Sequence, residues 1–139
     1  MDFSEQIQEI AAHVNGITRQ AANKHSISFA QAQFLLRVPS DGISISELSS
    51  LIGIDISTMS RNVNKLELLE LIKRERDSND GRTFRLSLTP SGVEIVDLLF
   101  AEIDARSTEV LSTIPLETQE GIGDVLEQLN WAFTRHREQ

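Results

Sequence analysis

The stretch from Ser44 to Thr89 constrains the fold most, because it combines two short helical patterns, a tight turn and two strands. The first helix is predicted to begin at Ser44, where Ser44-Ile45-Ser46-Glu47 has the pattern of a capping box. Gly53 can adopt the left-handed conformation that ends a helix, and Asp55 is the next N-cap. A second helix follows from about Ile56 to Leu69. Two helices joined by so short a turn have helix-turn-helix spacing.

The second helix has one apolar and one polar face. The apolar face repeats at helical period, which predicts that it is buried: Ile56, Met59, Val63 and Leu66. Arg61 projects almost opposite this stripe. Its neighbours can donate to phosphates and read base edges in a major groove: Ser57, Thr58, Asn64 and Lys65. The alternative is that this is an ordinary solvent-exposed helix face. Such a face usually contains both acidic and basic residues, whereas this helix has no acidic residue before Glu67.

A β-hairpin is predicted after these helices. Residues 71–76 can form one strand, residues 77–81 are rich in turn formers, and residues 82–88 alternate apolar and polar side chains. Phe84, Leu86 and Leu88 are expected on the half-buried side of the second strand. Thr89-Pro90 is a start signal for another helix. A hairpin in this place is a wing, and Arg82 near its tip suits a narrow minor groove.

These motifs together resemble the MarR family of winged-helix transcription regulators. The resemblance is carried by Ser46-Glu47-Leu48, Ile52-Gly53-Ile54, Ser57–Arg61, Leu66-Glu67, Asp77–Arg82 and Leu86–Gly92. Asp80 and Arg82 match the Asp and the second Arg of the family's wing motif. Three positions depart from the pattern: Gly81 replaces the first wing Arg, Ser78 replaces a Pro, and Glu70 replaces a frequent Gly.

The resemblance implies a mainly α fold with a small β-wing, a winged helix-turn-helix flanked by N- and C-terminal dimerisation helices. We expect one domain over residues 1–139, with the winged helix-turn-helix in residues 28–89 and the dimerisation part in residues 1–24 and 90–139. It also implies a homodimer that reads a pseudo-palindromic double-stranded DNA site, most simply as a repressor. A small aromatic or anionic effector between the dimer helices and the winged part is implied as well.

We expect the DNA contacts to come from both helices, the first strand and the wing. The candidate residues are Ser44, Ser57, Thr58, Ser60, Arg61, Asn62, Asn64, Lys65, Arg74, Asn79, Asp80 and Arg82.

The charge balance is acidic, but its distribution is compatible with DNA binding. The chain has 139 residues and a net charge of −8. From Arg37 to Thr89, however, eight basic residues face eight acidic ones, so the whole excess lies in the flanks. Cys is absent, which excludes disulfides and thiolate metal sites. His13 and His25 have no second ligand at metal spacing, so no metal and no cofactor are predicted.

The flanking segments are predicted to be helical. Apolar residues recur in heptad fashion from Phe3 to Ala21, residues 28–38 and 90–113 form two further helices, and Pro115 starts the last one. Gly121 and Gly123 suggest a bend or a close helix contact there, but not a nucleotide loop, since no strand precedes them. No apolar run approaches the roughly 18 residues of a membrane span, and we expect a cytoplasmic protein without membrane contact.

Two other function classes are open. A winged-helix module used only for protein–protein contact would fit the acidic flanks. An enzyme is disfavoured, because Ser57, Ser60 and Asp80 have no His beside them to act as a base, so no catalytic residue is predicted.

Overall fold

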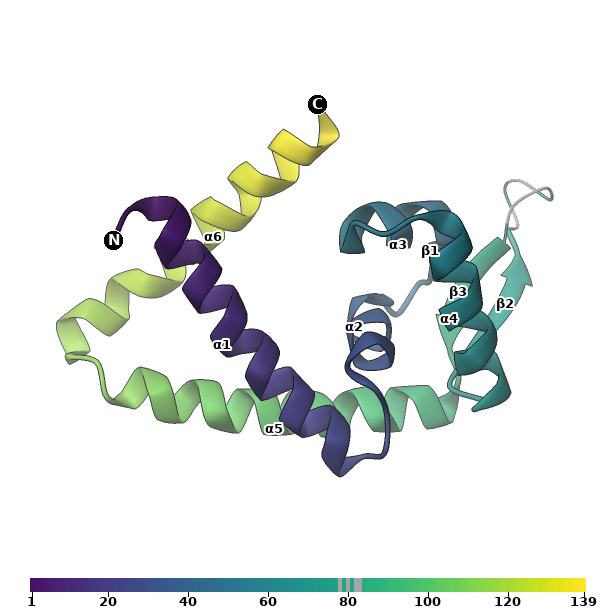
Figure 1. The fold of residues 1–139 in the computed structure, drawn as a ribbon, viewed down its shortest axis with the longest axis horizontal. Coiled ribbons are helices and arrows are strands. Elements are labelled where there is room, and N and C mark those ends of the chain that lie inside the picture. The colour runs from purple at the N-terminus through teal and green to yellow at the C-terminus, as the bar shows by residue number, and fades with distance from the viewer. Residues whose placement is uncertain (78, 80, 82–83) are drawn as a thin grey trace. The chain divides into compact units, whose positions relative to one another are not determined.

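The computed structural model describes residues 1–77, 79, 81 and 84–139. The helices are α1 (Phe3–Lys24), α2 (Phe29–Arg37), α3 (Ile45–Ile52), α4 (Ile56–Leu68), α5 (Pro90–Ser112) and α6 (Leu116–Glu138). The strands are β1 (Ile43–Ser44), β2 (Ile72–Arg76) and β3 (Phe84–Leu88). This is the predicted fold class, mainly α with a small antiparallel wing (Figure 1). The chain divides into two compact units, residues 1–103 and 104–139.

The sheet is antiparallel and has the strand order β1-β3-β2. Ile43 pairs with Leu86 in β3, and Ile72 in β2 pairs with Leu88. The predicted hairpin is therefore confirmed, and β1 adds a short third strand that ties the start of α3 to the wing. Figure 1 shows β2 and β3 beside α4, with α3 leading into α4.

Short-range capping signals define the helix-turn-helix. Ser44 Oγ accepts the Glu47 N–H at 3.1 Å, which is one half of the predicted capping box. The reciprocal bond, in which the Glu47 carboxylate would accept the Ser44 N–H, does not occur among the described residues. Gly53 ends α3 in the left-handed conformation, with φ 78° and ψ 35°, as predicted. Asp55 is the N-cap of α4, also as predicted.

The core of the first unit brings α2, α3, α4, the sheet and the start of α5 together. Its largest fully buried side chains are Leu35, Leu48, Met59, Val63, Leu66, Leu86 and Leu99. Burying this set removes the apolar faces of α3 and α4 from water, which is the main stabilising term for such short helices. Two apolar predictions were wrong: Ile56 is 57% exposed and Phe84 is 41% exposed. Ile56 is the first residue of α4, and Phe84 is the first residue of β3, so each lies at the margin of the core.

Helices α1 and α2 have complete capping boxes. Asp2 and Glu5 form one at α1, and Ser28 and Gln31 form the predicted one at α2. Ala21 and Ala22 bury the end of α1 against the core, whereas Phe3, Ile10 and Val14 of its heptad pattern are exposed.

The second unit contains the end of α5 and all of α6. No residue of α6 is buried, although Val125, Leu126, Trp131 and Phe133 are apolar. An added Cβ at Gly121 or Gly123 would meet nothing within 4 Å among the described residues. Of the two predicted possibilities, a bend or a close helix contact, the close contact is therefore not formed within the second unit.

Candidate nucleic-acid interface

Arg61 and Lys65 lie on the outward face of α4 and are exposed. Neither forms a hydrogen bond or an ion pair with any described residue. The buried residues Met59, Val63 and Leu66 fix the rotation of the helix, so these two cations face solvent. Their donors are available for phosphates or base edges.

The first turn of α4 is organised by Asp55. Its Oδ1 accepts from Ser57 Oγ at 2.6 Å and from the Thr58 N–H at 2.8 Å, and its Oδ2 accepts from Thr58 Oγ1 at 2.8 Å. The Ser57 hydroxyl first, then the Thr58 N–H and hydroxyl, hold the pKa of the Asp55 carboxyl well below its usual range. Because both hydroxyl protons point to Asp55, Ser57 and Thr58 can only accept further hydrogen bonds.

Asn62 and Ser60 are partly buried, unlike Arg61 between them. Asn62 Nδ2 donates to the Thr58 carbonyl oxygen at 2.9 Å, a bond back along the same helix. Asn62 is therefore less available for DNA than the sequence pattern indicated. Ser44 is likewise engaged, as the N-cap of α3.

Asn64 and Arg74 are brought together, although they are ten residues apart in the chain. Arg74 Nη2 donates to Asn64 Oδ1, and Arg74 Nε donates to Glu67 Oε1 at 2.6 Å. Arg74 thus connects β2 to α4 through two side chains of the helix.

The base of the wing is held by arginines. Arg85 Nη2 donates to the Gly42 carbonyl oxygen at 2.8 Å, and Arg85 Nη1 lies 3.6 Å from Asp77 Oδ2. Arg76 donates to the Gly81 carbonyl oxygen and stacks over Phe84 at 5.4 Å. The Asn79 N–H donates to Asp77 Oδ1 at 2.9 Å. The candidate residues Asp80 and Arg82 lie outside the described residues.

The sequence analysis predicted Asp55 as an N-cap but missed its bonds to the Ser57 and Thr58 hydroxyls, and it missed the roles of Glu67 and Arg85. For Asp55 a signal existed, since an Asp followed by hydroxyl residues at the second and third positions is a local capping pattern. Glu67 and Arg85 act through contacts between different elements, which have no local signal.

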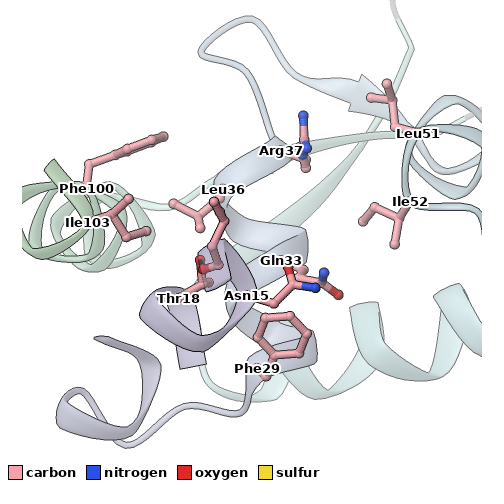
Figure 2. A pocket seen from close by; sticks show the side chains of 11 residues that line it. Asn15, Thr18, Phe29, Gln33, Leu36, Arg37, Leu51, Ile52, Phe100 and Ile103 are labelled. Atoms are coloured by element: carbon pink, nitrogen blue, oxygen red, sulfur yellow. Dashed lines mark hydrogen bonds between the residues drawn. The ribbon is translucent and has the colours of Figure 1, made fainter. Parts of the chain in front are cut away.

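A hollow of about 380 Å³ lies between α1, α2, α3 and the first part of α5 (Figure 2). Much of its lining is apolar: Val14, Phe29, Leu36, Leu51, Ile52, Phe100 and Ile103. Asn15, Thr18 and Gln33 add polar groups, and Arg37 is the one charged side chain among the described residues that line it.

Residues 25–83, which contain the helix-turn-helix and most of the wing, match the model of the MarR family. The fold agrees over nearly the whole chain. A crystal structure of MarR has a TM-score of 0.84 at 21% identity, over 99% of this chain and 95% of that one. Residues 25–83 thus resemble the MarR family in sequence, and nearly the whole chain has the fold of MarR.

The chain also resembles individual relatives. The "Uncharacterized HTH-type transcriptional regulator YxaD" of Bacillus subtilis (strain 168) is 32% identical over 89 residues, which are 64% of this chain and 62% of YxaD. The match thus spans less than two thirds of that relative. The S. aureus MepR–DNA complex has a TM-score of 0.72 at 21% identity, over 95% of this chain and 98% of MepR.

In the described part of the chain, no helix is both long and apolar enough to span a membrane. The same part contains no cluster of three or more His, Asp or Glu side chains that could hold a metal ion.

Proposed function

We propose that this protein is a transcription regulator that binds double-stranded DNA sequence-specifically. The observation that carries the proposal is the outward face of α4, where Arg61 and Lys65 are exposed and unpaired among the described residues. The match of residues 25–83 to the MarR family model and the resemblance to the fold of MepR, which has been solved with DNA, support the same proposal.

In this proposal α4 reads the major groove, and the wing contacts the adjacent minor groove. Of the candidate contacts, Arg61, Lys65, Asn64 and Ser57 present the exposed part of this surface. The wing candidates Asn79, Asp80 and Arg82 remain predictions from the sequence.

The proposal includes a homodimer. Exposed apolar side chains on α1 and α6 support it, since a helix with no buried residue needs a partner for its apolar side chains. Two α4 helices related by a two-fold axis would read half-sites about one helical turn apart.

We further propose repression that is relieved by a small aromatic or anionic ligand. The hollow near Arg37 supports this part, because it combines apolar walls with one cation. A ligand would act by favouring a spacing of the two α4 helices that does not fit DNA. The regulator would share the cytoplasm with the DNA that it reads.

A selection of bound duplexes from a random pool tests the proposal. We expect recovered sequences with two related half-sites, bound with an affinity that falls steeply with salt. A module that contacts only proteins would recover no sequence and show no salt-dependent shift. With a selected duplex placed over a promoter, transcription should fall when the protein is added and recover when benzoate, as an aromatic anion, is supplied.

A further inference from the structure

Arg74 lies on β2, but its side chain is directed at α4. Ile72 and Arg74 share one face of the strand because successive side chains alternate, and Ile72 is only 2% exposed. On α4, Asn64 and Glu67 are three residues apart and are therefore neighbours on the helix surface. The Arg74 guanidinium bridges both, with Nε on Glu67 and Nη2 on Asn64.

This bridge fixes the orientation of the Asn64 amide. A guanidinium can only donate, so the Asn64 atom that faces it must be the carbonyl oxygen. The amide nitrogen then points away from Arg74, and Asn64 is an exposed residue. An Asn with both groups free pairs with adenine by donating and accepting at once. Asn64 Oδ1 keeps a second lone pair, but the bond turns this oxygen toward Arg74 and leaves the amide nitrogen as the group directed away from it. That donor suits a phosphate oxygen or the O6 and N7 atoms of guanine.

The bridge also removes a charge conflict. Glu67 is the acidic residue of α4 itself, and its carboxylate would repel DNA phosphates if it were uncompensated. The Arg74 and Glu67 side chains are 28% and 35% exposed, and the pair is neutral. Arg74 therefore brings no net positive charge to the DNA surface.

We propose that Arg74 is a positioning residue for base recognition and not a phosphate contact. It holds Asn64 as a donor toward DNA, neutralises Glu67, and so sets the base preference at one position of each half-site. This inference rests on the proposed DNA-binding function.

The salt dependence of duplex binding is the first test. The double variant Glu67→Gln/Arg74→Met removes both charges and all guanidinium donors while keeping most of the side-chain volume. We expect the slope of log affinity against log salt to equal that of the parent protein. In the matched control Lys65→Gln, the loss of one phosphate contact per protomer, two per dimer, should reduce the magnitude of the slope by about 1.8. A similar reduction in the double variant would overturn the inference, because it would make Arg74 a phosphate contact.

Base preference is the second test, and a merely structural role would not change it. Selection from random duplexes with the double variant should enrich adenine at one position per half-site, where the freed Asn64 amide can pair with it. Adding Asn64→Ala should abolish this enrichment. An unchanged base preference in the double variant would overturn this inference but leave the proposed function standing. A parent protein that binds no duplex would overturn the proposed function and this inference with it.

Discussion

At the scale of single residues, the side chains on the polar face of α4 differ in the hydrogen bonds that they can still form. Ser57 and Thr58 donate their hydroxyl protons to Asp55 and can only accept. Arg61 and Lys65 have no partner among the described residues and can only donate. The first turn of α4 therefore suits base amino groups, as on cytosine or adenine, and its middle suits guanine or phosphate.

Arg61 should contribute more to base preference than any other described side chain of α4. We expect Arg61→Ala to weaken binding to the preferred duplex by about 1–3 kcal/mol and to relax one position per half-site. The melting temperature should not change, because the side chain is exposed. Arg82→Ala, at the predicted wing tip, should instead weaken all duplexes evenly. If Arg61→Ala binds every duplex as the parent does, α4 is not the reading helix.

Asp55 should make the stability of α4 depend on pH. Its pKa is lowered in the folded protein, so the charged cap stabilises the fold fully above the ordinary carboxyl pKa of about 3.9. This contribution is lost as the pH falls toward the lowered value. Asp55→Asn keeps a competent N-cap without the charge. Its urea midpoint should be below that of the parent at pH 6, and the two should converge in acid. Equal midpoints at pH 6 would contradict the stabilising role of the charge.

At the scale of elements, the turn from α4 to β2 contains a strained residue. Glu70 has a φ of 58°, a left-handed conformation that side chains rarely adopt. The MarR family frequently has Gly at this position, and the structure gives the physical reason. The bonds around it hold the turn in place, since the Leu71 N–H donates to the Leu66 carbonyl oxygen at 3.0 Å and the Thr89 hydroxyl donates to the Glu70 carbonyl oxygen.

Glu70→Gly should therefore stabilise the protein. Removing the left-handed strain gains about 1–2 kcal/mol, and the greater freedom of Gly in the unfolded chain offsets part of this. We expect a net gain of roughly 0.5–1 kcal/mol in the free energy of unfolding, measured by urea denaturation. Glu70→Ala retains the strain and serves as the control. A gain of the same size in Glu70→Ala would assign the effect to the lost charge instead.

Gly92, in the first turn of α5, should not tolerate a side chain. A Cβ there would lie 2.0 Å from the Leu71 carbonyl oxygen, which is backbone and cannot move away cheaply. We expect Gly92→Ala to lower the melting temperature markedly, against the usual helix preference for Ala. Gly123→Ala, in the open surroundings of α6, is the control and should stabilise by up to about 1 kcal/mol. A stabilised Gly92→Ala variant would show that the contact with Leu71 can relax.

The sequence predicts those elements best that depend on neighbours in the chain. The caps at Ser28 and Asp55 and the helix end at Gly53 are local, and each occurs as expected. Periodicity predicts the direction of a side chain but not the depth of the core on that side, which is why Ile56 and Phe84 were misjudged. The direction of Arg74 depends on how β2 packs beside α4, and no spacing in the sequence encodes that.

At the scale of the whole molecule, α6 has no buried residue, while five of its large apolar side chains are about half exposed or more. A lone chain would keep this apolar surface in water, which is unfavourable. We therefore expect the second unit to pack against a partner surface, which in the proposed homodimer is supplied by the second copy of the chain.

Light scattering at micromolar concentration should give twice the chain mass of 15.6 kDa. Leu126→Glu places a charge among the exposed apolar side chains of α6 and should shift the mass toward the monomer. DNA affinity should fall with it, because the second α4 is lost. Gln128→Glu introduces the same charge at an exposed polar position and should leave the dimer intact. A monomeric parent protein with full DNA affinity would exclude DNA binding through two α4 helices related by a two-fold axis.

The junction at Leu71, Thr89 and Gly92 has a mechanical consequence. The Leu71 carbonyl oxygen accepts the Thr89 N–H at 3.1 Å, and the Thr89 hydroxyl accepts the Gly92 N–H at 3.0 Å. Backbone bonds and a close packing contact thus join the end of α4, the root of the wing and the first turn of α5. These contacts hold the three segments closely together, so we expect a small tilt of the beginning of α5 to move α4 and the wing with it as one body. Any pivot of the molecule must then lie further along α5, beyond its first turn.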